Sequence, residues 1–287
     1  MSSQRLVATT ARLGMRWLRD NPPTSDLLLP VADDVWFYEM LLLRHARTHP
    51  TQESQWASHR DTSLARMLKI APDAYLANVT EDLWAEELVA VAMFAHLGFL
   101  LDPTAPATLD FVHRFLSYLD EQAHRLGSLP PLLAFCLAHN LREMGAKIPA
   151  AVQAPVNEQL VVRGLTGPER TLAAAYLHTH LILFAHGTYR RTPESLEPLG
   201  PSFHFITEHT TVVAGYGWAD LCAEFAICLS LAGRQDKDFW YLIDALVKLQ
   251  SPDGRWTHPR IDERQSRHST MMSVLALFEV EEEAGRG

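Results

Sequence analysis

The apolar runs of this chain predict helices of two kinds, and the two kinds alternate along the sequence. Runs such as "LAAAYLHTHLILFA" and "LCAEFAICLSLAG" are apolar on all sides, whereas "LDFVHRFLSYLDEQAHRL" and "KDFWYLIDALVKLQ" carry a polar stripe. A helix that is apolar all round is expected to be buried, and one with a polar stripe is expected to face solvent. The alternation therefore predicts an all-α fold with an inner ring of helices inside an outer ring, which is the α/α toroid.

The helical periodicity and the Pro and Gly punctuation place the helices. We expect them at 3–20, 31–48, 54–70, 81–100, 106–126, 130–144, 152–163, 168–186, 218–232, 236–250 and 268–284. A degenerate outer helix within 193–212 would complete a toroid of about six helical hairpins. The one strand-like run, "HTTVV" at 209–213, lies inside the long segment from Arg190 to Gly217. Since no Gly- or Ser-rich linker interrupts the chain, the sequence predicts a single domain over 1–287.

Composition narrows the class of protein. The chain has 287 residues, of which 47% are hydrophobic, and a formal net charge of −9. It can therefore build a sizeable core, and it lacks the basic character of a nucleic-acid-binding protein. The sequence shows neither an N-terminal apolar segment nor a long enough apolar run, so we expect no membrane span and a cytoplasmic protein. Arginine far outnumbers lysine, which favours a high-GC, actinobacterial source.

A short motif near the C-terminus supports the toroid. Gln250 to Trp256 reads "QSPDGRW", between a predicted outer helix and a predicted inner helix. It resembles the QW motif of the terpene cyclase and protein prenyltransferase toroids, in which an outer helix ends, turns through Asp-Gly and gives way to an inner helix. Gly254 can adopt the tight turn, and Trp256 can stack back on the helix end. The motif bears on the fold and not on the reaction.

The C-terminal part also resembles an uncharacterised family of helical proteins common in actinomycetes. The resemblance lies in Thr179-His180, in Glu224 to Leu229, in Asp253-Gly254 and in the helix start His268 to Thr270. It implies no activity.

Each predicted inner helix carries an ionisable side chain near its start, where the helices of a toroid would open at one mouth. The strongest candidates for catalysis are His180, Glu224, His268 and Asp34. A carboxylate in "ADLCAEFAICL" is costly to bury unless it is paired. We expect Glu224 to bind a metal, to pair with a histidine or to act as a general base with a raised pKa. The alternative is an ion pair with an arginine. Asp34 is either an acid at the mouth or, with Asp33, a cap at the start of its helix.

Two of these histidines form a possible metal site with the carboxylate. His180, Glu224 and His268 would make a two-histidine, one-carboxylate set of the kind that holds iron or zinc. His178 and His180 point about 200° apart on a helix, so one of them faces the cavity and the other packs. We expect His180 to be the one at the site. The alternative is that each is a hydrogen-bonded core histidine.

Further side chains near the proposed mouth are candidates for binding substrate. We assign this role to Trp36, His178, Tyr189 and Trp218, whose rings could stack on a ligand or stabilise a cation. Ordinary packing is the alternative for each. The arginines of "LRHARTHP" and "GTYRRTP" could clamp an anionic substrate or simply face solvent.

These features predict a small-molecule enzyme of specialised metabolism, working in a central cavity by histidine and carboxylate chemistry with or without a divalent metal. One alternative is a terpene-cyclase-like enzyme, although the D-x-D-D motif of class II cyclases is absent. The other is a non-catalytic protein that binds a peptide or metabolite. The sequence predicts no nucleic-acid partner and does not constrain the oligomeric state.

Overall fold

The computed structural model describes residues 3–23, 28–153, 156–257 and 263–284, and these residues are helical with no β-strand among them. They fall into two compact units. Unit 1 comprises Met1–Thr24, Glu39–Ser54 and Thr171–Gly287, and unit 2 comprises Ser25–Tyr38 and Gln55–Arg170. An all-α fold is confirmed, whereas the toroid and the single domain stay predictions.

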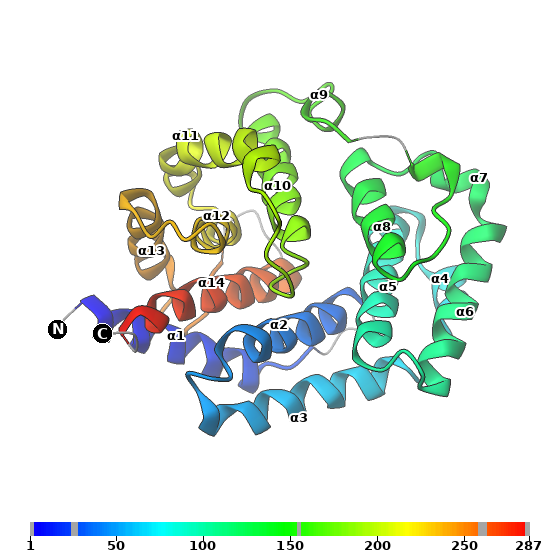
Figure 1. The fold of residues 1–287 in the computed structure, drawn as a ribbon, viewed down its shortest axis with the longest axis horizontal. Helices are drawn as coiled ribbons and strands as arrows, with labels where there is room; N and C mark the ends of the chain where they lie inside the picture. The colour runs from blue at the N-terminus through cyan, green and yellow to red at the C-terminus, as the bar shows by residue number, and fades with distance from the viewer. Residues whose placement is uncertain (1–2, 24–27, 154–155, 258–262, 285–287) are drawn as a thin grey trace. The chain divides into compact units, whose positions relative to one another are not determined.

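The helices follow the predicted positions for most of the chain (Figure 1). Unit 1 contains α1 (Ser3–Asp20), most of α10 (Gly167–Ala185), η2 (Glu197–Leu199), α11 (Gly200–Tyr216), α12 (Ala219–Leu231), α13 (Lys237–Leu249) and α14 (Glu263–Ala284). Unit 2 contains most of α3 (Pro50–Met67), α4 (Pro72–Asn78), α5 (Glu81–Leu101), α6 (Pro106–Glu121), α7 (Ala123–Leu126), α8 (Pro131–Glu143), η1 (Ala150–Val152) and α9 (Glu158–Val161). Both units include part of α2 (Leu29–His45).

Three local predictions were wrong. The helix expected at 152–163 is two short pieces, η1 and α9, and the side chain of Asn157 caps the second by accepting from the amide of Leu160. The short helix α4 was missed. The strand-like run 209–213 lies inside α11, whose buried residues Phe203, Ile206, Thr210 and Val213 recur with the helical period. Helical burial outweighs the strand preference of β-branched residues here.

The core of unit 1 is built on α12, which packs against α13 and α14, while α14 also packs against α1. In Figure 1, α12 is seen end-on among α10, α11, α13 and α14. Every residue of α12 from Ala219 to Ser230 is buried, as expected for a helix that is apolar all round. Any charged side chain on α12 must therefore find its partners inside the protein.

The turn that follows α13 contains Gln250 to Trp256 and is held by side-chain hydrogen bonds. Nε2 of Gln250 donates to the carbonyl of Thr10 at 2.9 Å and to that of Gly254 at 2.9 Å. Trp256 is fully buried, and its Nε1 donates to the carbonyl of Leu246 on α13 at 2.7 Å. Gly254 has φ +100°, a left-handed conformation that suits glycine. These contacts tie the end of α13 to the middle of α1.

In unit 2 a buried carboxylate stabilises the start of α2. Oε2 of Glu87 accepts from the amides of Leu28 and Leu29, at 3.0 and 3.2 Å, and from the hydroxyl of Tyr75 at 2.8 Å. A carboxylate at this position satisfies amides that have no partner within the helix and interacts favourably with its dipole. Because α2 begins at Leu29, Asp34 is not at the helix start, and the capping role considered for it is wrong.

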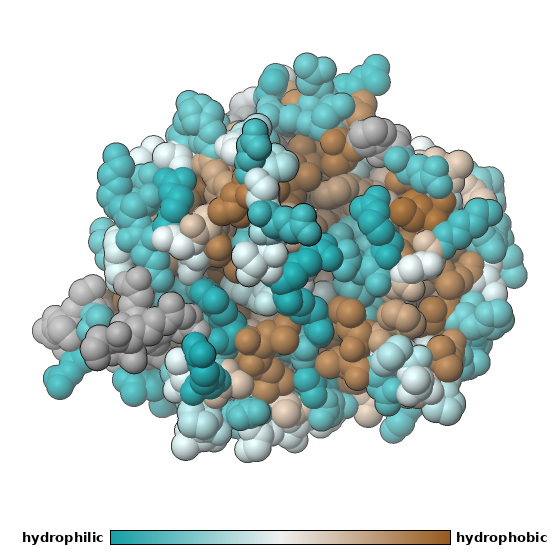
Figure 2. All heavy atoms as spheres, viewed as in Figure 1, coloured by the Kyte–Doolittle hydropathy of each residue, from teal (hydrophilic) through white to brown (hydrophobic). Residues whose placement is uncertain are grey.

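One helix, α5, is long and apolar enough to cross a membrane by length and composition alone, which the sequence analysis did not anticipate. Its most apolar window is 67% buried. The core helix of a globular unit has the same properties, and α5 packs against α6 and α8. On the face shown in Figure 2, hydrophobic residues form separate groups between hydrophilic ones.

We predict that Gly254→Val destabilises the protein by about 2–4 kcal/mol, since positive φ and close packing both oppose a side chain there. A Cβ at this position would lie 2.5 Å from the carbonyl oxygen of Leu13. The control is Gly127→Ala, where a Cβ meets nothing within 4 Å. Chemical denaturation measures both. Equal stability of Gly254→Val and wild type would contradict the described turn.

Candidate functional site

A buried carboxylate on α12 lies at the centre of the candidate site in unit 1. Glu224 is 2% exposed, and its Oε2 accepts a hydrogen bond from the hydroxyl of Thr179 on α10 at 2.5 Å. Nε2 of His268 on α14 lies 3.9 Å from Oε1 of Glu224, a distance suited to an ion pair rather than a hydrogen bond. Glu224 therefore connects α10, α12 and α14.

A second carboxylate lies one turn earlier on the same face of α12. Asp220 is 6% exposed and accepts a hydrogen bond from the hydroxyl of Tyr176 on α10. The pairs Tyr176–Asp220 and Thr179–Glu224 match because residues three or four apart share a face of a helix. Two adjacent turns of α10 thus each present a hydroxyl donor to a carboxylate of α12.

The pKa values of the two carboxyl groups are shifted in opposite directions. Burial raises the pKa of Asp220, and the nearby Glu224 charge raises it further, while the Tyr176 hydroxyl opposes the shift. Burial also opposes ionisation of Glu224, but His268, His180 and the Thr179 hydroxyl together outweigh it and hold its pKa below the usual value. The charged form is therefore favoured at Glu224 and disfavoured at Asp220. Environments that shift the pKa values of two neighbouring acids in opposite directions are typical of acid–base sites.

Two partly exposed histidines lie beside this buried pair. The side chain of His268 is 37% exposed, and His180 is half-buried. Nδ1 of His180 lies 2.7 Å from the carbonyl of Tyr176. Since a carbonyl only accepts, Nδ1 donates this hydrogen bond, and Nε2 is the ring nitrogen left for another contact. The site therefore combines a charged carboxylate with imidazoles that solvent can reach.

The structure brings together three of the four predicted catalytic residues, His180, Glu224 and His268. Asp34 is buried in unit 2, and Trp36 lies in the same unit with its ring 5.7 Å from that of His96. Of the histidine pair on α10, His178 faces α11. Its Nδ1 is 3.0 Å from Oγ of Ser202, and its ring stacks on Phe205.

The remaining predicted binding residues are Trp218 and Tyr189. Trp218 precedes the first turn of α12 and stacks on Tyr216. Tyr189 lines a separate pocket of unit 1, beyond the end of α10.

This arrangement does not test whether His180, Glu224 and His268 bind a metal. Within the described part of the chain, no group of three or more His, Cys, Asp and Glu side chains is placed to hold a metal ion. Among these residues, Glu224 instead interacts with the hydroxyl of Thr179 and with His268. A bound divalent metal stays a prediction.

The sequence analysis missed Asp220 and its partner Tyr176. The signal was present, because Asp220 and Glu224 are four residues apart in an otherwise apolar helix and must therefore share a face. Cys228 is fully buried, and burial raises its pKa well above the usual value, so it is a neutral core thiol.

No family model, no curated protein and no solved structure matches this chain.

We predict opposite effects on stability for Glu224→Gln and Asp220→Asn. The lowered pKa of Glu224 means that its charged form adds stability above about pH 4.5, which is lost as the pH falls through the folded-state pKa. The raised pKa of Asp220 means that its charged form subtracts stability as the pH rises above 3.8. Near pH 7, Glu224→Gln should therefore lower Tm and Asp220→Asn should maintain or raise it. Both differences should shrink toward about pH 4, and Tm changes of the same sign near pH 7 would contradict the opposed shifts.

Proposed function

We propose that the protein is a small-molecule enzyme whose acid–base chemistry is carried out at Glu224, His268 and His180. The observation that carries the proposal is the pair of buried carboxylates on α12 with opposed pKa shifts, beside two histidines that solvent can reach. Buried charge of this kind is costly to maintain, and in a protein it is most often retained at a site that uses it.

Each residue has a role that its position supports. The Glu224 carboxylate lies on the Nε2 side of His268 and would stabilise the imidazolium that forms when His268 takes a proton from a substrate. Asp220, whose pKa is raised, would supply a protonated carboxyl group next to that charge. Thr179 and Tyr176 hold the two carboxylates in place as hydrogen-bond donors.

We propose further that the helices form a toroid. Its support is the alternation within unit 1, where α12 is buried on all sides while α11 and α13 keep a polar stripe and the Q-x-x-x-G-x-W turn joins α13 to α14. The central cavity, the role of Asp34 at its mouth, a divalent metal on His180, Glu224 and His268, specialised metabolism and a cytoplasmic location belong to the same proposal.

The second candidate is a protein that binds a peptide or metabolite without turning it over. Aromatic and hydroxyl side chains on α10, such as those of Tyr176 and Thr179, favour this binding protein, because such groups also recognise ligands. A cyclisation of the terpene-cyclase kind is less well supported, since the charged carboxylate here is paired with histidine and hydroxyl groups.

The enzyme proposal predicts that Glu224→Gln keeps the fold and loses activity by about 100-fold or more, the scale of general acid–base catalysis. The assay is depletion of compounds from a small-molecule extract, followed by mass spectrometry, with bound metal measured on the same samples. His180→Ala should behave similarly, with some loss of stability from the cavity it leaves.

The matched control is an exposed pair of the same residue types. His204 and Glu208 on α11 lie 3.1 Å apart with side chains 73% and 56% exposed, so Glu208→Gln and His204→Ala should change neither activity nor metal content. Folded Glu224→Gln protein with wild-type turnover would contradict the enzyme proposal. A compound that stays bound through purification and is never converted would favour the binding protein instead.

A further inference from the structure

Four arginines form a row along the exposed face of α1. They are Arg5, Arg12, Arg16 and Arg19, and all four are exposed. At 3.6 residues per turn, their spacing places them within about 60° of one another around the helix. The first and the last are separated by roughly 21 Å along the helix axis. We call this row the arginine stripe.

The opposite face of α1 is covered by the rest of unit 1. Val7, Ala11 and Leu18 are buried on that face, where α1 packs against α14 and α13. The contact is close at Gly14, since a Cβ there would lie 2.6 Å from the side chain of Val274 on α14. The arginine stripe therefore points away from the core and is the part of α1 that a partner outside the chain can reach.

The arginine stripe is unfavourable for α1 itself over most of its length. Like charges three or four residues apart on a helix repel each other, and Arg12, Arg16 and Arg19 have these spacings. Arg5 lies in the first turn, where the helix dipole disfavours positive charge and where α1 has no acidic residue. Of the four, Arg19 alone lies in the last turn, where the dipole favours it. The stability of α1 therefore does not explain the stripe.

Within the described part of the chain, three of these four arginines have no carboxylate partner. Arg19 pairs with Asp20, with Nε and Oδ1 2.9 Å apart. Arg12 donates to the hydroxyl of Thr9 at 3.4 Å, a contact that neutralises no charge. Arg5 and Arg16 form no ion pair with these residues. The stripe thus keeps most of its positive charge.

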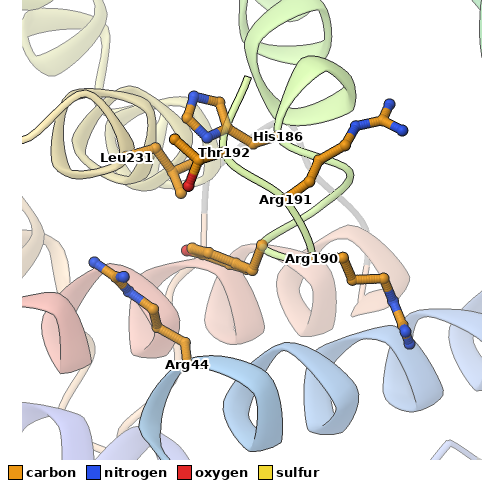
Figure 3. Close-up of a pocket in the computed structure, with 7 residues that line it drawn as sticks. Arg44, His186, Arg190, Arg191, Thr192 and Leu231 are labelled. Atoms are coloured by element: carbon orange, nitrogen blue, oxygen red, sulfur yellow. The ribbon is translucent and has the colours of Figure 1, made fainter. Parts of the chain in front are cut away.

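Other arginines of unit 1 are neutralised inside the unit. Arg44 pairs with Glu279 and Arg190 pairs with Glu39, and both arginines line the pocket that Tyr189 also lines (Figure 3). The whole chain has a net charge of −9, whereas α1 carries four arginines and one aspartate. Because the Debye length is about 8 Å at physiological ionic strength, a partner at the stripe meets the local positive charge rather than the net charge.

We propose that the arginine stripe docks the protein on a lipid surface that carries anionic headgroups. A straight row of cations is complementary to a flat layer of negative charge, and basic segments bind anionic lipids in this way. Leu6, beside Arg5, is 44% exposed and adds an apolar contact with the lipid. Since the apolar face of α1 stays packed in unit 1, the binding is peripheral and mainly electrostatic. The stripe includes none of the proposed catalytic residues.

Nucleic acid is the competing polyanion, and it fits the stripe less well. Proteins that bind single strands combine basic side chains with exposed aromatic rings on which bases stack. Trp17, the one aromatic residue of α1, is buried. The chain as a whole also lacks the basic character of a nucleic-acid-binding protein. A second copy of α1 does not fit, because two facing stripes repel each other.

The test is sedimentation of the full chain with vesicles at millimolar lipid. Phosphatidylcholine vesicles with about 30% phosphatidylserine should pellet wild-type protein, and pure phosphatidylcholine vesicles should not. Raising NaCl from about 0.1 M to about 0.5 M should release the protein, because salt screens exposed charges. The triple variant Arg5→Gln, Arg12→Gln, Arg16→Gln should bind the anionic vesicles about 100-fold more weakly, since each arginine at the surface contributes about fivefold.

The matched control is Arg66→Gln, Arg142→Gln, Arg163→Gln, which removes the same charge at exposed arginines of unit 2 and should bind as wild type does. Circular dichroism checks the helix content of both variants, and Arg12→Gln alone, with a loss of about fivefold, replaces a triple variant that does not fold.

Three results overturn the proposal: no binding of wild type to anionic vesicles, equal binding to both kinds of vesicle, or equal losses in the stripe and control variants. Transfer of the protein from the vesicles to single-stranded DNA of equal charge concentration overturns it as well, since the stripe would then be a nucleic-acid surface.

Discussion

A carboxylate enclosed in an apolar core is destabilising unless donors surround it. Among the described side chains of α12 and α14, three buried carboxylates are of this kind. Asp220 and Glu224 receive hydroxyl donors from α10, and Glu279 receives the hydroxyl of Ser230 at 2.5 Å together with Arg44. Each of these contacts joins two different helices. The requirement to satisfy the buried carboxylates therefore fixes how α2, α10, α12 and α14 are held in unit 1.

The buried carboxylates form two different arrangements, one near the start of α12 and one near its end. Toward its start, the carboxylates meet histidines that solvent can reach, and one carboxylate is held charged while its neighbour favours the protonated form. Near its end, Glu279 is paired with Arg44 beside a donor-rich pocket. Between them Cys228 is fully buried and neutral. The first arrangement is suited to moving protons, and the second joins α2 to α14 by a buried ion pair.

The all-α class and most helix positions could be predicted because the periodic spacing of hydrophobic residues is a local property of the sequence. Glu224 and its histidines could be found because ionisable residues in apolar helices are conspicuous. Asp220 was missed because it was not compared with Glu224, which lies four residues later on the same helix face. The partners of Glu279 could not be predicted, because Arg44 lies 235 positions earlier in the chain, and only the fold brings it near. The ion pair between Arg190 and Glu39 likewise joins residues 151 positions apart.

The most direct measurement is a pH titration of the side-chain carboxyl carbons by NMR, with carbon-13-labelled aspartate and glutamate and with Asp220→Asn and Glu224→Gln to assign the two signals. The structure predicts that Glu224 titrates below its usual pKa of 4.5 and that Asp220 titrates above its usual pKa of 3.8. A Glu224 signal that titrates above 4.5, or an Asp220 signal that titrates below 3.8, would contradict the opposed pair on which the acid–base site rests.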